Sequence, residues 1–536
     1  MVGQQCTAQI GIRRNQNIVT DTTTQFKTQL PRNLSLQVLS FLVQVGIGIW
    51  LVPYLVGHLG RAAYGLIPIA GAMTQYVSLI SHNVSVSVNR FLTIALQRND
   101  AKEANRIFNT AFFSYLAIAV IQIPLFGLLI YYANSIFTIP DELYSDAIIL
   151  LSCSATGFLI NLVCSVFGVP IYANNRLDIS RSIDIARQVF RVVGVVTLFL
   201  KFGPALRYVG YVDLAISVTA CLMTLTIGKR LAPILKLDFH AYDWRKVREL
   251  TAMGGWLLVN HLGALLFLRV DIWICNRFIG AEEAGDYAAV LQWSALIRGA
   301  GTVIAGVIAP MIIIYYARFE IERLVRLSKL SVRVFSLVLA IPISLLCVFS
   351  QPLLRIWLGD SFAGLWPLMV IMVCHLGINV GVMPLFNIQI AVNKVAWPGL
   401  ITLIMGIANL TVAIFLARYI GWGIYGVAIA GAIVLTAKNA LFTPIYGALI
   451  LHQPWYTFLR SYVSGLVFLG GLLILGYILG RYVQPASWIH LGATCLIIGL
   501  AGLIASWFIL SKRDRRLMID LMPGRFRSLV ERLMPV

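Results

Sequence analysis

The chain has 536 residues, of which 59% are hydrophobic and only 12% are charged, and its mean hydropathy is +0.83. Charged residues make up about 25% of a typical soluble domain. This composition excludes an ordinary soluble protein and predicts a chain that crosses the membrane many times. The net charge of +20 does not indicate nucleic acid as a partner, because in such a chain the basic residues report membrane topology.

Residues 1–30 are polar and lack the pattern of a cleaved signal peptide, so we expect a loosely ordered cytoplasmic tail. Apolar runs of about 18 to 25 residues then indicate about 14 transmembrane helices in an all-α fold. We place these helices near residues 34–57, 65–88, 108–132, 146–170, 183–200, 208–227, 251–275, 287–311, 330–350, 365–386, 397–416, 423–449, 461–480 and 488–510. Residues 512–536 form a second, basic tail.

The distribution of basic residues predicts the orientation. Most of the 42 Lys and Arg residues lie in segments on one side of the membrane. The opposite side holds only Arg61, Lys201, Arg207, Arg277, Arg355, Arg418 and Arg481. Since basic residues concentrate in cytoplasmic segments, we expect both termini in the cytoplasm, an even number of spans, and a multi-pass protein of the cell (inner or plasma) membrane.

An internal repeat predicts the domain organisation. Gly57 and Tyr64 follow the first span with the same spacing as Gly280 and Tyr287 follow the seventh. Further matches recur through both halves, which predicts parallel six-helix lobes at 31–235 and 236–455, with two additional helices at 456–511. Two similar bundles that face each other would enclose a central cavity, the natural site for a substrate.

Catalytic and metal-binding motifs are missing from the sequence. We find no phosphate-binding glycine loop, no G-x-S-x-G motif and no insertion large enough for a catalytic domain, so we expect no enzyme activity, no catalytic residue and no cofactor. Seven cysteines lie in apolar runs without metal-ligand spacing: Cys153, Cys164, Cys221, Cys275, Cys347, Cys374 and Cys495. We therefore expect packing roles, with neither a disulfide nor a metal site.

Charged residues inside the spans are the strongest candidates for a binding site. Each costs about 2.5–3.5 kcal/mol at the centre of a spanning helix, so it usually faces a partner or a wet cavity. The cations are Arg191, Arg269, Arg298 and Lys438, and the acids are Asp213 and Asp271. The excess of cations favours an anionic substrate, and a phosphate or pyrophosphate suits the planar fork of arginine.

These charges differ in how deeply they lie. Arg298 is deep in the eighth span, with Ser294 and Thr302 one turn away on either side. Asn260 and Asp271 are eleven residues apart, which predicts that they share a helix face, whereas Arg269 points across it. Arg269 could alternatively reach the outer headgroups, and Lys438 the cytoplasmic interface.

Uncharged polar residues form further stripes at helical spacing. Gln37, Ser40 and Gln44 share a face of the first span, and His82 and Asn89 lie on one polar face of the second. These side chains either line the cavity or only form hydrogen bonds between helices. Arg191 lies on the same side of the fifth span as Asp184 and Arg187, at a cytoplasmic entrance or in an internal stack of ion pairs.

Two segments carry a resemblance to a known family. They are RVDIWICNRFIGAEEAGDY at residues 269–287 and WGIYGVAIAGAIV at residues 422–434. With the two six-span halves, they resemble Wzx-type O-antigen and exopolysaccharide flippases of the multidrug/oligosaccharidyl-lipid/polysaccharide exporter superfamily. Asp271, Gly280, Tyr287 and the run of Gly426, Val427 and Ala428 match the family, and the resemblance covers about residues 30–510.

The resemblance implies a flippase for surface polysaccharide biosynthesis. Such a protein moves a polyprenyl-pyrophosphate-linked oligosaccharide from the cytoplasmic to the outer leaflet by alternating access, without ATP. Membrane lipids, a polysaccharide polymerase and glycosyltransferases are its expected partners. Alternatives are a lipid II flippase, or a cation-coupled multidrug exporter, which would need more carboxylates. A polytopic glycosyltransferase or ligase is disfavoured, because the longest predicted outside segment, near residues 136–146, is short.

Overall fold

The computed structural model describes residue 32 and residues 35–98, 100–174, 176–247, 255–483 and 485–521. Regular structure in these residues is helical throughout, without strands. The predicted tail at 1–30 lies outside the described residues, and only the beginning of the tail at 512–536 lies within them. The predicted all-α fold is confirmed.

The N-terminal half of the chain contains the helix Ser35–Leu59, α2 (Arg61–Gln97), α3 (Ala101–Tyr131), α4 (Ala133–Ile136), η1 (Asp141–Leu143), α5 (Tyr144–Cys164), η2 (Ser165–Gly168), α6 (Val169–Ala173), α7 (Leu177–Phe202), α8 (Leu206–Leu231) and η3 (Phe239–Ala241). Apolar helices suit a membrane, because they satisfy every interior backbone hydrogen bond within one segment.

The C-terminal half contains α10 (Gly255–Leu268), α11 (Val270–Phe278), α12 (Ala281–Ala317), α13 (Ile321–Val348), α14 (Ser350–Leu358), η4 (Asp360–Leu365), α15 (Trp366–Cys374), α16 (Leu376–Asn379), η5 (Met383–Leu385), α17 (Phe386–Ala391), α18 (Ala396–Ile414), the π-helical turn η6 (Phe415–Tyr419), α19 (Gly423–Ala437), the π-helical turn η7 (Lys438–Phe442), α20 (Thr443–Leu449), α21 (Leu459–Gly480), α22 (Trp488–Ile509) and α23 (Lys512–Leu521).

Eleven described helices are long and apolar enough to cross a membrane, or up to 12 if the bent pair α10 and α11 forms one span. Helices α2 and α7 coincide with the predicted spans near 65–88 and 183–200 but do not meet this test. The physical reason in α7 is its charge, since Arg181, Asp184 and Arg187 occupy its first half. The exact number of 14 spans therefore stays a prediction.

The helices form two compact units. Unit 1 consists of the described parts of Met1–Gly48, Ile80–Ile130 and Ile149–Gly254, and unit 2 of those of Ile49–Leu79, Tyr131–Ile148 and Gly255–Val536. Two segments from the N-terminal half thus fold with the C-terminal half. The lobe boundaries at 31–235 and 236–455 remain a prediction.

The core of unit 1 lies where α2, α3 and the α5–η2 junction meet. Val88, Leu92 and Phe108 are almost completely buried there, and the rings of Phe108 and Phe167 meet edge to face at 5.2 Å. One expectation about this unit is wrong: Cys164 and Cys221 form a disulfide. The reason is tertiary, because η2 and α8 pack together and bring the two Cα atoms to 5.6 Å.

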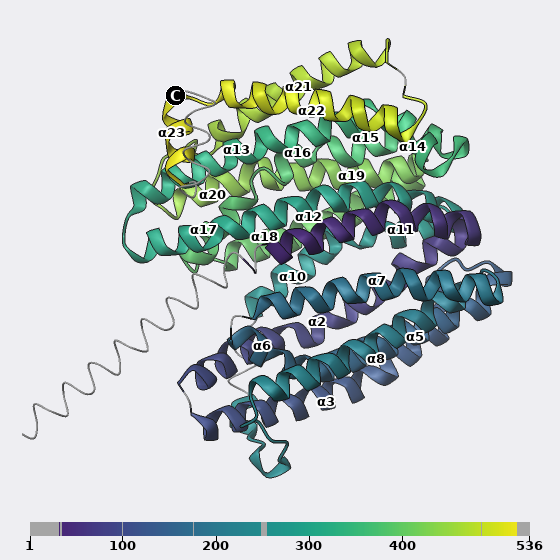
Figure 1. Ribbon diagram of the computed structural model, residues 1–536, viewed down its shortest axis with the longest axis vertical. Helices are drawn as coiled ribbons and strands as arrows, with labels where there is room; N and C mark the ends of the chain where they lie inside the picture. The colour runs from purple at the N-terminus through teal and green to yellow at the C-terminus, as the bar shows by residue number, and fades with distance from the viewer. Residues whose placement is uncertain are drawn as a thin grey trace, which may run out of the picture. The chain divides into compact units, whose positions relative to one another are not determined.

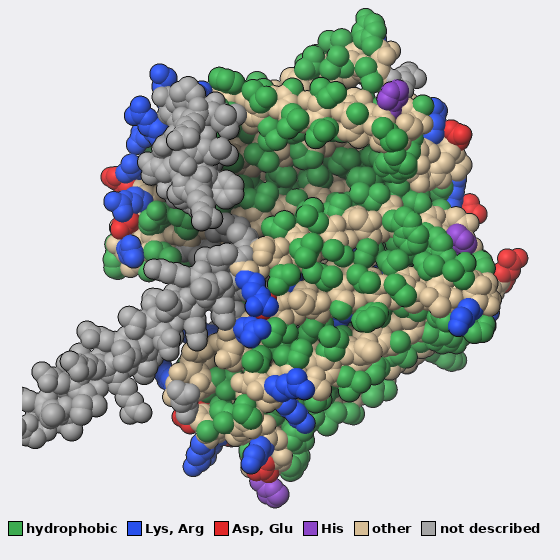
Figure 2. Space-filling model, in the orientation of Figure 1, with side chains coloured by type: hydrophobic (Ala, Val, Ile, Leu, Met, Phe, Trp, Pro, Cys, Tyr) green, Lys and Arg blue, Asp and Glu red, His purple; other side chains and the backbone are tan. Residues whose placement is uncertain are grey.

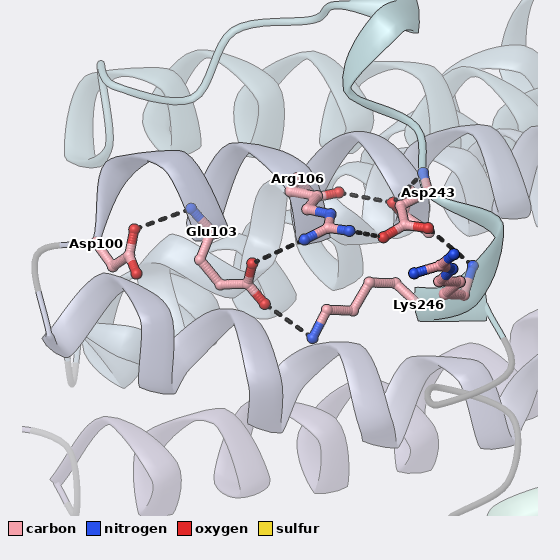
Figure 3. A network of polar contacts seen from close by, with 7 residues as sticks. Asp100, Glu103, Arg106, Asp243 and Lys246 are labelled. Atoms are coloured by element: carbon pink, nitrogen blue, oxygen red, sulfur yellow. Dashed lines mark hydrogen bonds and ion pairs between the residues drawn. The ribbon is translucent and has the colours of Figure 1, made fainter.

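The segment after α8 is attached to the first turns of α3 (Figure 3). Asn105 donates to the carbonyl of Ile234 (2.7 Å) and accepts from the N–H of Lys236 (2.8 Å). Asn109, one turn further on, accepts from the N–H of Asp238 (2.8 Å) and donates to the carbonyl of Lys236 (2.8 Å). Two side-chain amides therefore hold the backbone of residues 234–238 in the linker, which we define as residues 232–247.

Charged residues add a second attachment between the linker and α3 (Figure 3). Asp243 pairs with Arg106, and Lys246 with Glu103 (2.9 Å). The backbone N–H of Arg245 donates to Asp243, and together with Arg106 it lowers the pKa of this carboxyl from its ordinary value, against the opposing effect of burial. The carboxylate form is therefore the one that the folded linker stabilises.

Replacing Asp243 with asparagine should loosen the linker at pH 7. Because the folded pKa is lowered, the stabilisation is present above the unfolded pKa of about 3.9 and is lost as the pH falls through the folded value. Hydrogen exchange of a peptide spanning the linker should thus be faster in the variant at pH 7 and should approach that of wild type as the pH falls through the lowered pKa of Asp243. Asp238→Asn is the control, because the Asp238 side chain accepts its hydrogen bonds from His240 of the same loop. Equal exchange at pH 7 would contradict the attachment.

In unit 2, α21 packs along α13, and α22 also contacts α13 (Figure 1). The contact with α21 is close because Gly465 lies directly on Ser336, where an added Cβ would come within 2.2 Å of the Ser336 Cβ. Helices α10 and α18 approach one another equally closely at Gly263 and Gly406. Hydrophobic side chains cover the flanks of the helices on the face seen in Figure 2, whereas Lys and Arg lie mostly toward helix ends. This is the pattern of a protein surrounded by lipid.

Candidate functional site

A helix break positions the candidate site. Helices α10 and α11 meet at Arg269 with a bend of 44°, and Arg269 itself has a non-helical backbone (φ −133°, ψ −19°). The face predicted to join Asn260 and Asp271 is therefore wrong, since the helical period is interrupted between them. Asn260 is exposed, whereas Asp271 is 9% exposed in the first turn of α11.

Asp271 receives one hydrogen bond from the next helix. The Tyr287 hydroxyl of α12 donates to its Oδ2 at 3.0 Å, and Tyr287 is only 1% exposed. Asp271 Oδ1 has no hydrogen-bond donor among the described residues. A buried carboxylate with only one donor is poorly solvated, so it needs a cation, a proton or a further donor nearby.

Helices α18 and α19 complete the surroundings of Asp271. Asn409 of α18 is fully buried, and its Nδ2 donates to the carbonyl of Leu266 (3.1 Å) while its Oδ1 lacks a donor in the described chain. A Cβ placed on Gly431 of α19 would lie 3.7 Å from Asp271 Oδ2 and 3.8 Å from Asn409 Oδ1. The two oxygens therefore face the same glycine, and three helices converge on one polar spot.

Arg298 supplies the positive charge of this site. It lies in the interior of α12, where its Nε donates weakly to Ser294 Oγ at 3.4 Å. Asp271 and Tyr287 are near enough to interact with it electrostatically. Among the described residues, however, Arg298 makes no ion pair within 4 Å. We name Asp271, Tyr287, Arg298 and Asn409 the Asp271 cluster.

Lys438 begins a π-helical turn between α19 and α20, with its Nζ 5.4 Å from the centre of the Phe386 ring. It has no carboxylate partner in the described part of the chain. Beside it, Asn439 donates to Asn379 Oδ1 (2.9 Å) and Asn379 donates to Thr436 (2.9 Å). This chain of buried amides holds the π-helical turn in place.

Arg191 already has a carboxylate partner. In unit 1 its Nη2 donates to Asp213 Oδ2 at 3.0 Å, and its Nε lies 3.0 Å from Oδ1. The neighbouring charges also have partners, since Arg187 donates to Asn161 (2.7 Å) and Arg181 pairs with Asp184 (3.2 Å). Of the two readings of this stripe, the structure supports the internal ion pairs.

The remaining predicted residues are not part of the Asp271 cluster. Gln37 is half-buried, and Gln44 and Asn89 are exposed, all three in unit 1. The side chain of His82 lies outside the described residues. Arg269 is half-buried at the helix break.

Sequence reasoning missed Asn409 and the pairing of Asp271 with Tyr287. A signal for Asn409 existed, because it is the only amide in the apolar α18. Tyr287 was recognised as a motif residue, but nothing in the sequence alone gives its hydroxyl a partner. No group of three His, Cys, Asp or Glu residues suited to a metal occurs in the described ranges.

Many helices long and apolar enough to cross a membrane, with charged side chains buried among them, define the chain as a multi-pass membrane protein. Solved structures share this fold. The lipid II flippase MurJ in an inward closed conformation covers 90% of this chain and 99% of its own, with a TM-score of 0.65 at 15% identity. An inward-facing multidrug resistance MATE family transporter of the MOP superfamily covers 82% of this chain and 98% of its own, with a TM-score of 0.59 at 12% identity.

Sequence comparison specifies the family. Residues 30–315 match the family described as polysaccharide biosynthesis protein. The "uncharacterized membrane protein EpsK" of Bacillus subtilis (strain 168) is 30% identical over 498 residues, which cover 92% of this chain and 98% of the relative. The chain therefore belongs to the polysaccharide biosynthesis protein family, and it shares its fold with the lipid II flippase and the multidrug transporter named above.

Proposed function

We propose that the protein is a flippase that moves a polyprenyl-pyrophosphate-linked oligosaccharide from the cytoplasmic to the outer leaflet. The lobes alternate access to a central site, as in other transporters built from repeats. The protein lies in the cell membrane with both termini in the cytoplasm. A polysaccharide polymerase and glycosyltransferases act before and after it in surface polysaccharide biosynthesis.

One observation carries this proposal. Arg269, Arg298 and Lys438 lie within or beside apolar helices of unit 2 and make no ion pair with a carboxylate among the described residues. Among the described acids of the predicted spans, Asp271 is near Arg298, and Asp213 is paired with Arg191. Unit 2 thus carries an excess of unpaired positive charge in a low-dielectric interior, where the attraction for an anion is stronger than in water.

A pyrophosphate-linked glycan fits the rest of the architecture. Its sugar hydroxyls need hydrogen-bonding groups throughout a layer of about 30 Å, while its polyprenyl tail can stay in lipid. Arg298 would bind the pyrophosphate, since a guanidinium forms paired hydrogen bonds with phosphate oxygens. Asp271, which accepts a hydrogen bond from Tyr287, would hold Arg298 in place electrostatically.

Two alternative functions would require different side chains from the same helices. A cation-coupled multidrug exporter needs carboxylates for its drugs, and Asp213, the second acid of the spans, is already paired with Arg191. A lipid II flippase would also carry a pyrophosphate, so the Asp271 cluster does not distinguish it. The distinction must come from the sugar.

Transport by the purified protein in liposomes tests the proposal. We expect it to move a fluorescent polyprenyl-pyrophosphate oligosaccharide between leaflets at a rate well above that of protein-free liposomes. Lipid II and a cationic dye, measured in parallel, identify the rivals. Transport of the dye alone would overturn the proposal in favour of an exporter, and transport of lipid II alone would overturn the assigned substrate. Repeating the measurement with imposed proton, sodium and electrical gradients identifies the energy source.

A further inference from the structure

Segments predicted to lie outside the membrane meet one another within unit 2. Asn276 of α11 makes a buried contact, since this residue is only 1% exposed. Its Oδ1 accepts from the N–H of Thr138 (2.8 Å), and its Nδ2 donates to the carbonyl of the same residue (3.1 Å). Close by, Trp273 Nε1 donates to the carbonyl of Ile136 (3.2 Å). One amide and one indole thus bind the backbone after α4.

A charged contact joins the beginnings of α2 and α12. Arg61 Nη1 donates to Asp286 Oδ2 at 3.2 Å, and the guanidinium lies 4.2 Å from the centre of the Phe362 ring in η4. The two helices touch through glycines, since an added Cβ on Gly285 would come within 2.0 Å of the Arg61 carbonyl oxygen. This close approach lets a single ion pair bridge two backbones.

A third contact anchors the helix Ser35–Leu59. The indole Nε1 of Trp357 in α14 donates to the carbonyl of Ile49 at 2.5 Å. The Trp357 ring packs edge to face on Trp293 of α12 at 5.2 Å. The second half of the helix is thereby tied to α12 and α14.

We propose that Arg61, Asn276, Asp286 and Trp357 form a clasp that closes the outer side of the transporter and must open each time substrate leaves. The inference rests on the proposed function. Each contact joins a segment of the predicted N-terminal lobe (49–79 or 131–148) to the predicted C-terminal lobe. A rocking motion that separates the lobes on this side therefore breaks these contacts together, and the motion needs no rearrangement within either predicted lobe.

The contacts are suited to repeated opening. The clasp consists of a few hydrogen bonds and one ion pair, which water can replace when the surfaces part. Asn276 binds a backbone through two bonds, so it restores the same register at every closure.

Cys275 offers a natural reporter, because it is a free cysteine that is completely buried beside Asn276. We would measure its rate of labelling by a membrane-impermeant maleimide added to the outside of cells. Arg61→Asp places two carboxylates together at the clasp and should raise this rate about tenfold, the change that about 1.4 kcal/mol produces. The swapped pair, Arg61→Asp with Asp286→Arg, should return the rate to that of wild type.

The control variants test the clasp independently of which substrate is transported. Cys275→Ser must abolish the signal, and Asn276→Ala, which removes the contact with Thr138, must raise labelling without any change at Arg61. Equal labelling in wild type, Arg61→Asp and Asn276→Ala at equal protein abundance would overturn the clasp. Faster labelling only in inside-out vesicles would overturn its place on the outer side. Because labelling requires no substrate, these outcomes do not depend on which lipid is carried.

Discussion

Replacing Arg298 with alanine should reduce surface polysaccharide to a small fraction of the wild-type amount while the protein remains present in the membrane. A hydrogen bond to a charged group contributes about 1.5–3 kcal/mol, so losing the guanidinium should slow transport by about 10- to 100-fold. The effect should be large because Arg298 is the cation of the Asp271 cluster and lies in the interior of α12. The measurement is complementation of a flippase-deficient strain, with protein abundance determined on the same samples.

Two further variants make the result interpretable. Arg298→Lys keeps the charge but loses the planar fork, and should retain part of the activity. Arg418→Ala removes an exposed arginine that stacks on Phe278, and should leave transport unchanged. If Arg298→Ala instead depletes the protein itself, the arginine has a packing role and the proposed anion site loses its main support.

Asp271→Ala should follow Arg298→Ala in direction, because it leaves Arg298 without its electrostatic neighbour.

Introducing leucine at Gly263 should prevent α10 from packing on α18 and strongly lower the yield of folded protein. A Cβ at this position would already lie 2.6 Å from the Leu403 nitrogen and from the Thr402 carbonyl carbon, and both are backbone atoms that cannot rotate away. Overpacking a core typically costs about 1–3 kcal/mol, and a backbone contact places this variant at the upper end. The readout is the temperature at which half of the monodisperse protein is lost in detergent.

Gly471→Leu is the matched control for this substitution. It makes the same change within α21, at a glycine whose added Cβ would have no neighbour within 4 Å. It should leave the midpoint near that of wild type, or raise it slightly, because leucine has the higher helix propensity. An equal loss of stability in both variants would show that leucine harms any transmembrane glycine position, and that the α10–α18 contact is not special.

Much of the fold could be predicted because the bilayer imposes simple rules on sequence. A run of apolar residues as long as α18 or α21 has few alternatives to a spanning helix. The same rules fail for α7, where charges such as Arg187 find partners only in the folded bundle. The helical structure of the predicted spans could therefore be predicted from the sequence. Apolarity alone does not determine how many of these helices cross the membrane.

The candidate site was predictable in its residue types but not in its geometry. Arg298 and Asp271 stood out because charge in an apolar run is expensive. The break at Arg269 was not predictable, since no proline or glycine lies within five residues of it to mark it. Consequently the helical period placed Asn260 with Asp271, while the true neighbours, Tyr287 and Asn409, come from other helices.

The attachment of the linker to α3 has a consequence for how this chain can vary. Asn105 and Asn109 bind only main-chain atoms, and the side chains of Ile234, Lys236 and Asp238 remain exposed. Residues 234–238 of the linker are therefore held through their backbone, whereas Asp243 and Lys246 are held through their side chains. Substitutions along 234–238 that keep the backbone path should be tolerated, whereas a proline at Lys236 or Asp238 would remove an N–H that an amide accepts. This part of the stretch between the repeats can thus change its side chains while its path stays fixed.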